Sequence, residues 1–405
     1  MSIGFDPIVS SALFTASLLP HAVRPKARLE VPSRPSDNPP RVSVIVALYQ
    51  EKPEDIEMTV QSLLVQTYPR DRFEVLFAVE AHDEPVHAHA QASICTLRTA
   101  GIASRLVVSH GGKRLKAYAL NRAIDEADGE ICAFYDASDD IEPAQLEKAA
   151  GLMQEHGYDA VQATVLRKGR SILSEFLFID TAFWFRKYIP FVLGLAKGMP
   201  LSGEGLFVRR SVLNEVGGFP EVLTEDAYLG IILTERGKRF GLVSSVVTEK
   251  APRNMRAHFV QRLRWNRGYI TCLGHLLRSS MPLRTKCVLA LPFLTPLSCS
   301  LAFVAWMLIL GQWVASMLGG VAIPDISLSA LQHPLYVQAM ATWALLLFLV
   351  GIPLCVASYI RTLKGLDMRK SAPFVLLLPY YWTFIGFAAT CSLFKNTTNW
   401  GKTER

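Results

Sequence analysis

Charge is scarce in this sequence: Asp, Glu, Lys and Arg make up 19% of the 405 residues, below the roughly one quarter usual in soluble domains. Three stretches, 287–324, 326–360 and 371–394, contain none of these residues. A bilayer core is about 30 Å thick and needs roughly 20 apolar residues of helix to cross it. Since half of the residues are hydrophobic, a disordered chain is excluded, and membrane segments are predicted in the last third.

Cysteine pairs are also missing. The seven cysteines include no CxxC pair, and several lie in apolar runs. This pattern argues against a disulfide framework and against a zinc site, and it favours reduced, packed thiols.

The net charge is +7, yet nucleic acid is not the expected partner. Many of the basic residues flank the charge-free stretches: Arg278, Arg284, Lys286, Arg361, Lys364, Arg369 and Lys370. Basic residues at such places are typical of cytoplasmic loops. The sequence thus predicts an integral protein of the cell (inner) membrane with its polar domain in the cytoplasm. It predicts spans near 298–320 and 336–360 and a re-entrant or shallow segment at 371–394.

Three regions follow from these patterns. Residues 1–40 hold a short apolar segment, Ile8–Pro20, expected to lie at a membrane interface, and a Pro/Ser linker. Residues 41–285 carry the polar chemistry. Residues 286–405 form a membrane region with two to four segments.

The middle region has an α/β pattern. Apolar, β-branched runs at 42–48, 73–80, 106–109 and 130–135 predict strands, and 53–66 and 116–127 predict helices between them. Alternating strands and helices indicate a doubly wound, mostly parallel sheet. In such sheets ligands bind beyond the carboxyl ends of the strands.

Aromatic residues crowd residues 171–201, interrupted by charges. We interpret this segment as an amphipathic helix lying on a membrane, because basic residues flank the aromatics. The alternative is a core helix under the sheet.

Acidic clusters stand at two predicted strand ends. Glu80 and Asp83 follow one strand, and Asp136, Asp139 and Asp140 follow another. Clustered carboxylates repel each other unless a cation joins them, and Mg²⁺ uses one or two carboxylates together with substrate phosphates. The alternative for the second cluster is a solvated acidic turn before a helix.

Two further motifs carry candidate chemistry. In VLTEDAYLG, Asp226 at a helix start is either a general base or, with Glu225, a charge that favours the helix N-terminus. In HFVQRLRWNRGY, helical spacing puts Gln261, Arg264 and Trp265 on one face. These residue types suit a phosphate-and-sugar site, or else a basic helix beside lipid headgroups.

Taken in order, these motifs resemble the membrane-integrated glycosyltransferases of family 2, of the cellulose synthase and hyaluronan synthase type. The resemblance covers about residues 41–285 and implies that they form a GT-A glycosyltransferase domain that includes interface helices. It rests on the segments TYPRDRFEVLFAVEAHD, KAYALNRA, FYDASDDIEP, LTEDAYLG, VTEKAP, QRLRWNRG and NWGKTER. It implies a GT-A-type fold followed by C-terminal transmembrane helices.

The resemblance also implies residue roles. The nucleotide pocket would be lined by Tyr49, Glu51, Glu80 and Asp83. Lys116 would approach the donor. Asp136 and Asp139 would hold Mg²⁺ or Mn²⁺ on the diphosphate. Asp226 would be the catalytic base, and Glu204, Gln261, Arg264 and Trp265 would bind substrate.

Two positions depart from the family pattern. The second carboxylate of the metal motif falls at Ser138, with Asp139 beside it. The loop Ser202–Gly205, which holds Glu204, replaces a loop richer in Thr, Ser and Asn.

The implied reaction is inverting transfer of a sugar from a nucleotide-linked, UDP-type donor to a growing polysaccharide or a lipid-linked acceptor, with a β-linked product. The alternatives are a non-processive glycolipid glycosyltransferase and a nucleotide-binding membrane scaffold without turnover.

Overall fold

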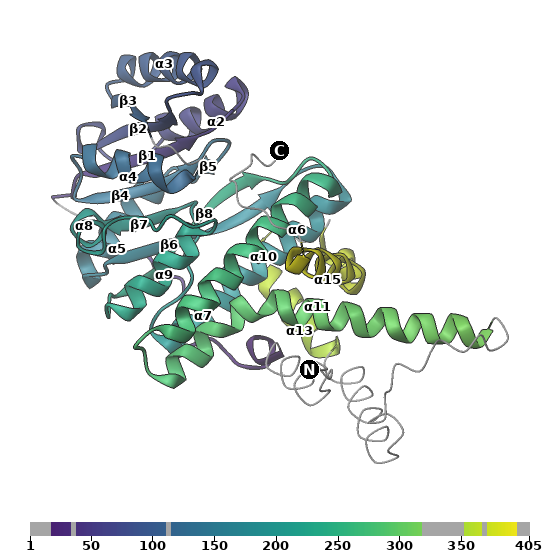
Figure 1. The fold of residues 1–405 in the computed structure, drawn as a ribbon. Coiled ribbons are helices and arrows are strands. Elements are labelled where there is room, and N and C mark those ends of the chain that lie inside the picture. The colour runs from purple at the N-terminus through teal and green to yellow at the C-terminus, as the bar shows by residue number, and fades with distance from the viewer. Residues whose placement is uncertain (1–17, 34–37, 111–114, 318–351, 367–370, 395–405) are drawn as a thin grey trace.

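A computed structural model describes residues 18–33, 38–110, 115–317, 352–366 and 371–394 of the chain. Figure 1 shows one sheet flanked by helices and, beside it, a second group of helices, most of which follow residue 250 in the sequence. The predicted apolar segment Ile8–Pro20 lies almost wholly outside the described residues.

The sheet has eight strands and is mixed. Their order is β3 (Ala103–Ser109), β2 (Phe73–Glu80), β1 (Val42–Leu48), β4 (Ile131–Asp136), β7 (Leu206–Arg209), β6 (Ala160–Lys168), β8 (Phe240–Lys250) and β5 (Asp140–Ile141). The first four strands are parallel. β7 runs antiparallel to both of its neighbours, β6 and β8 are parallel, and β5 is antiparallel to β8. An α/β fold is thus confirmed, while the prediction of a mostly parallel sheet holds for one half of it.

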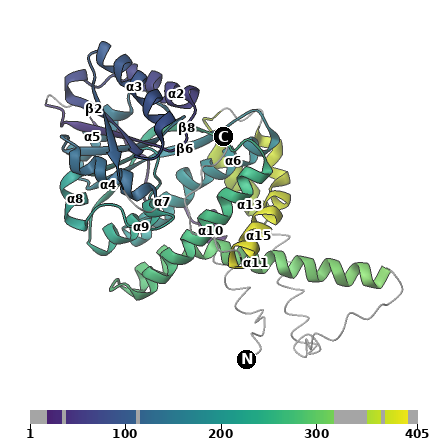
Figure 2. The ribbon, with the colours of Figure 1, turned by 45° about the horizontal axis from the view of Figure 1, so that its top comes forward.

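Helices cover both faces of the sheet (Figure 2). One face packs against α2 (Pro53–Leu64), α3 (Glu84–Thr99) and α5 (Gln145–His156). The other packs against α4 (Lys116–Glu126), α7 (Ile189–Ala196), α8 (Arg210–Val216) and α9 (Glu225–Glu235). Every residue of β1 and β2 is buried, which explains why their sequences are continuous apolar runs rather than alternating ones.

Helix α3 was not predicted from the sequence. Its apolar face is narrow, since only Val86, Ala90, Ile94 and Leu97 point into the core. The spacing of these residues is helical, but the His, Ser and Thr residues between them mask it. A short 3₁₀ helix, η1 (Arg70–Arg72), precedes β2.

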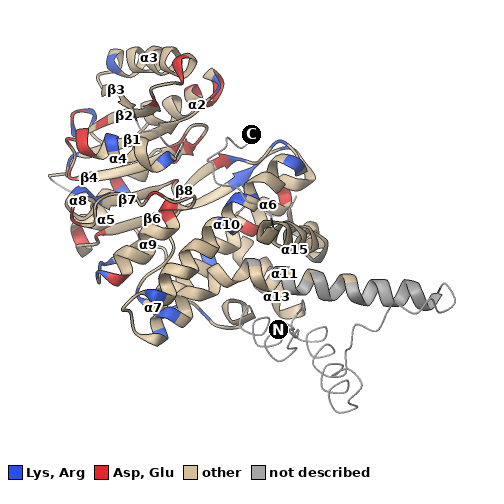
Figure 3. Ribbon diagram, in the orientation of Figure 1, with Lys and Arg blue, Asp and Glu red and all other residues tan. Residues whose placement is uncertain are grey.

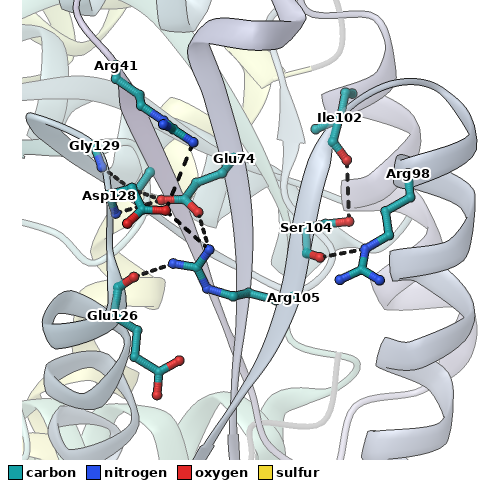
Figure 4. A network of polar contacts seen from close by, with 10 residues as sticks. Arg41, Glu74, Arg98, Ile102, Ser104, Arg105, Glu126, Asp128 and Gly129 are labelled. Carbon is teal, nitrogen blue, oxygen red and sulfur yellow. Dashed lines mark hydrogen bonds and ion pairs between the residues drawn. The ribbon is translucent and has the colours of Figure 1, made fainter.

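A buried polar network closes the amino ends of the strands (Figure 4). Glu74 on β2 is almost fully buried and forms an ion pair with Arg105 at 2.8 Å. Its carboxylate also accepts hydrogen bonds from Ser43 Oγ at 2.6 Å and from the Asp128 backbone N–H at 2.8 Å. Because these partners compensate the buried charge of Glu74, the network stabilises the fold at the amino ends of the strands. Candidate catalytic residues are therefore expected at the opposite edge, where the strands have their carboxyl ends.

The second group of helices packs on the sheet through α6 (Ile172–Phe183) and the π-helical turn η2 (Trp184–Tyr188). Residues 171–201 were interpreted as an amphipathic helix on a membrane, with a core helix as the alternative, and the burial of this segment fits the core-helix alternative. Leu177, Ile179 and Ala182 are fully buried, and Phe176 stacks on Tyr381 with ring centroids 5.3 Å apart. The aromatics of this segment therefore cover other helices of the same chain.

The remaining elements are α10 (Met255–Arg278), α11 (Leu283–Met317), α13 (Ile352–Leu363), the 3₁₀ helix η5 (Ala372–Leu377) and α15 (Leu378–Phe394). Among the described residues, no helix combines the length and apolarity needed to cross a membrane. This finding contradicts the predicted integral-membrane location. The predicted span 298–320 falls mostly on α11, and most of 336–360 lies outside the described residues. The stretch 371–394 is divided between η5 and α15, and its Val375, Tyr381 and Ile385 are buried in the helical core.

Candidate active site

The strand end at Asp136 is built around one ion pair. Asp136 is the last residue of β4, and the ammonium group of Lys116, at the first position of α4, pairs with its carboxylate oxygen Oδ1. Ser138 has a φ of +70°, in the left-handed region, so the chain turns back on itself. The Asp136 backbone N–H consequently donates to Asp139 Oδ2 at 2.9 Å. The Asp136 carboxylate stays partly exposed, while Asp139 is fully buried.

Asp226 lies close to this pair. It occupies the first turn of α9, and its Oδ1 accepts a hydrogen bond from the Ala227 N–H at 2.7 Å. The backbone N–H of Gly203 also hydrogen-bonds to the Asp226 carboxylate. A Cβ atom added at Gly203 would lie 3.2 Å from Lys116 Nζ and 3.6 Å from Asp226 Oδ2. The predicted base and the Lys116–Asp136 pair thus meet at the loop Ser202–Gly205.

Four carboxylates interact electrostatically with the Lys116 ammonium group: those of Asp136, Glu204, Glu225 and Asp226. Burial, and then the neighbouring Asp226, raise the pKa of Glu225 to about 8. Burial, and then Glu249 and Asp136, raise the pKa of Glu204 to about 7. Burial likewise raises the pKa of Asp226. Burial alone would lower the pKa of Lys116, but the charges of Asp136, Glu225 and Glu204 raise it. The site therefore holds more negative than positive charge.

The carboxylates of this site fit a divalent cation that is bound partly by the protein and partly by a diphosphate. No group of three or more His, Cys, Asp or Glu side chains in the described part of the chain is placed to hold a metal by itself. A nucleotide-bound Mg²⁺ or Mn²⁺ needs only one or two carboxylates, because phosphates supply other ligands. Asp136 is partly exposed in a negatively charged site and suits this role. Asp139 is held in the turn by the Asp136 N–H, and its role as a ligand stays a prediction.

The residues predicted to line a nucleotide pocket follow the ends of β1 and β2. Tyr49 and Asp83 are buried and Glu51 is half-buried. The Gln50 backbone N–H donates to Asp83 Oδ2, which joins the two strand ends. Within the described part of the chain, neither carboxylate oxygen of the buried Glu80 has a hydrogen-bond partner. Burial raises the pKa of Glu80 to about 7.

Helix α10 carries the motif with Gln261, Arg264 and Trp265, and it packs against the start of α9. Gly268 makes this possible, since a Cβ there would lie 2.4 Å from the Thr224 side chain. Gln261 is buried on the same helix, and Arg264 and Trp265 are half-buried.

Trp265 is held between two arginines that the sequence analysis did not select. The Arg167 guanidinium lies 4.5 Å from the centroid of the Trp265 ring, and that of Arg262 lies 5.1 Å from it. Arg167 forms a buried ion pair with Glu249 at 2.6 Å, and Arg262 pairs with Asp180 at 2.8 Å. The ring is therefore fixed in place, by cation–π contacts whose arginines are themselves held. The sequence signals for this arrangement were the VTEKAP segment, which contains Glu249, and the QRLRWNRG segment, which contains Arg262.

Asn121 was also missed, although it belongs to the KAYALNRA segment. Its side-chain amide donates to the Phe219 carbonyl at 2.9 Å and accepts from the Phe219 N–H at 2.7 Å. The helix that begins with Lys116 is thereby fastened to the loop that leads to α9. Lys116 and Asp226 owe part of their mutual placement to this amide.

Comparison with known proteins agrees with this geometry. Residues 133–389 match the model of Glycosyl transferase family group 2, and residues 43–217 match that of Glycosyl transferase family 2. The probable glycosyltransferase YdaM of Bacillus subtilis (strain 168) is 23% identical over 404 residues, covering 90% of this chain and 87% of that protein. The beta-monoglucosyldiacylglycerol synthase of Trichormus variabilis is 24% identical over 354 residues, covering 84% of this chain and 69% of that protein.

A solved structure shows the same fold. The mannosyltransferase PcManGT from Pyrobaculum calidifontis, in complex with GDP-Man and Mn²⁺, superposes with a TM-score of 0.60 at 22% identity, covering 90% of this chain and 99% of that one. The fold is thus GT-A-like, whereas the narrower resemblance to membrane-integrated cellulose and hyaluronan synthases is not supported. Since the family-group match spans more than half of the sequence, the chain belongs to glycosyl transferase family group 2 and is a glycosyltransferase that uses a nucleotide-sugar donor.

Proposed function

We propose that the protein is an inverting, divalent-cation-dependent glycosyltransferase in which Asp226 is the general base. One observation carries this proposal. The Asp226 carboxylate and the Lys116 ammonium both lie beside Gly203, and Lys116 is paired with Asp136 at the end of β4. A proton acceptor, a cation and a candidate metal ligand therefore meet at one point of the carboxyl edge.

The donor nucleotide would bind at the ends of β1 and β2, near Tyr49, Glu51 and Asp83. Glu80 supports this placement, because a buried carboxylate without a protein partner suits a ligand that brings its own N–H groups. Lys116 would then exchange its contact with Asp136 for the donor diphosphate, so that its positive charge faces the leaving group.

Asp136 is the residue we propose to bind Mg²⁺ or Mn²⁺, with Asp139 holding its backbone in place. The bound cation would neutralise charge that develops on the leaving diphosphate. Arg264 on α10 is the candidate for a further positive charge there.

On the acceptor side, Asp226 would take the proton from the attacking hydroxyl, which is a poor nucleophile otherwise. A single displacement inverts the anomeric centre, so an α-linked donor gives a β-linked product. Glu204, Gln261 and Trp265 are proposed to contact the acceptor.

The proposed acceptor is a saccharide. A second candidate, a lipid hydroxyl in a non-processive reaction, is favoured by the similarity to a beta-monoglucosyldiacylglycerol synthase.

The test is a screen of the purified protein with radiolabelled UDP- and GDP-sugars, each offered saccharide or diacylglycerol acceptors, with Mn²⁺ or with excess EDTA. We expect one donor to yield labelled, β-linked product only when the cation is present. Full activity in EDTA, or an α-linked product from an α-linked donor, would contradict the proposed mechanism.

A further inference from the structure

One pocket of the structure shares no residue with the candidate active site. It has a volume of about 390 Å³ and lies between residues 24–29 and the region where η2 meets α7. Its lining combines three arginines with apolar residues: Arg24, Arg28 and Arg186 with Pro25, Ala27, Leu29 and Pro190.

The N-terminal side of this pocket is held in place by backbone contacts. Gly194 on α7 allows the segment to approach, since a Cβ there would lie 3.0 Å from the Ala27 backbone nitrogen. At one end of the segment Lys187 Nζ donates to the Val23 carbonyl at 2.9 Å. At the other end Glu30 pairs with β8 in an isolated bridge to Val243. Figure 3 shows basic residues along this segment where it passes α7.

The other side is held by Arg186, which lies in η2. Its Nη1 donates to the carbonyls of Thr362 and Lys364, at 2.8 and 3.1 Å, at the end of α13. These two bonds orient the guanidinium but bring no negative charge to it. Burial lowers the pKa of Arg186.

Among the described residues, the positive charges around the pocket have no carboxylate partner in an ion pair. Burial, followed by the charges of Arg361 and Arg24, lowers the pKa of Lys187, so these three cations lie within electrostatic reach of one another. In residues 18–33, 38–110, 115–317, 352–366 and 371–394, no ion pair joins Arg24, Arg28, Arg186, Lys187 or Arg361 to a carboxylate. Like charges held together in this way repel, and a bound anion would relieve the repulsion.

We propose that this pocket binds the phosphate group of an amphiphilic molecule, with the arginines on the phosphate oxygens and the apolar residues on the attached carbon chain. Arginine suits this role because its planar fork of N–H donors matches phosphate geometry. Pro25, Leu29 and Pro190 offer surface for carbon atoms directly beside the guanidinium groups. The proposal does not depend on the transfer reaction, since no residue of the pocket belongs to that site.

The experiment compares two double variants that remove the same charge. Arg24→Gln with Arg28→Gln alters the pocket, while Arg72→Gln with Arg236→Gln alters exposed arginines elsewhere. Isothermal titration at fixed ionic strength measures binding of inorganic phosphate and of dihexanoylphosphatidylglycerol below its micellar concentration. Thermal unfolding checks that both variants are folded.

We expect the pocket variant to bind the phospholipid about tenfold or more weakly than the wild type, a change of one power of ten or above in Kd. The control variant should stay within about twofold. Tighter binding of the phospholipid than of inorganic phosphate would support an amphiphilic ligand, and the reverse order would contradict it. Equal losses in both variants, or no binding of either probe to the wild type, would overturn the proposal.

Discussion

The ammonium group of Lys116 is paired with the carboxylate of Asp136, although the first begins helix α4 and the second ends strand β4. This contact places a positive charge where the proposed donor diphosphate and its cation would bind. The charge of Lys116 also balances part of the charge of Glu204, Glu225 and Asp226. In the proposed mechanism, donor binding therefore rearranges the pair.

Asp136→Asn should reduce glycosyl transfer by orders of magnitude, because it removes the carboxylate proposed to bind the cation beside the leaving group. The variant should also need a higher Mn²⁺ concentration for half-maximal rate, which a metal titration measures. Asp140→Asn is the matched control, since Asp140 is exposed and lies four residues away. An unchanged metal requirement in Asp136→Asn would remove Asp136 from the cation site.

Gly268→Ala should disturb the contact between α10 and α9. The new Cβ would come within 2.4 Å of the Thr224 side chain, and overpacking of this kind typically costs about 1–3 kcal/mol. Because Thr224 precedes Glu225 and Asp226, we also expect kcat to fall. Gly274→Ala lies on the same helix with nothing within 4 Å of the new atom, and should raise stability by up to about 1 kcal/mol through helix propensity. Denaturant unfolding of both variants tests this, and equal effects would show that the contact is unimportant.

Asn121→Ala should loosen the attachment of α4 to the loop before α9. It leaves the peptide groups of Phe219 without their side-chain partner, at a cost of about 1–3 kcal/mol if they stay buried. Arg122→Ala, at the exposed neighbouring position, is the control. A variant with wild-type stability in urea unfolding would show that the amide is not required for the placement of Lys116.

The contribution of Glu225 to the stability of the ligand-free protein should fall as pH rises from about 5 to about 8. Glu225 has a pKa of about 8 in the folded state against an ordinary value of 4.5. Between these values the folded state keeps a proton that the unfolded state has lost, so rising pH favours unfolding. Above pH 8 the effect levels off.

Urea unfolding at several pH values measures this slope. Glu225→Gln should flatten it, whereas Glu54→Gln, at an exposed position on α2, should leave it unchanged. A slope that is the same in Glu225→Gln as in the wild type would contradict the assignment.

The parallel half of the sheet could be predicted from the sequence because its strands are buried on both faces. The runs at 42–48 and 73–80 coincide with β1 and β2, and the position of Asp136 at the end of β4 follows from the same pattern. The helical layer could not be predicted in this way. Apolar runs such as 171–201 and 371–394 indicate that the surface of a helix is removed from water. They do not indicate whether lipid or another helix of the protein packs against that surface.

The site was predictable only in part, for a related reason. Residues with distinctive chemistry, such as Asp226 and Trp265, stand out in a motif. Their supports do not, because Gly203, Asn121 and Arg167 act through contacts between segments far apart in the sequence. Long-range contacts of this kind leave no local periodicity, so the structure was needed to identify them.

The most direct test of the central claim is the transfer rate of Asp226→Asn, measured with the active donor at saturating cation. This change keeps the shape of the side chain and removes the proton acceptor. We predict a fall of roughly 10²–10⁴-fold in kcat. Nucleotide affinity should stay within about twofold of the wild type, because the proposed nucleotide pocket lies at the ends of β1 and β2. A folded Asp226→Asn protein that binds nucleotide and transfers sugar at a near-normal rate would contradict the account and return the choice of base to Glu204 or Glu225.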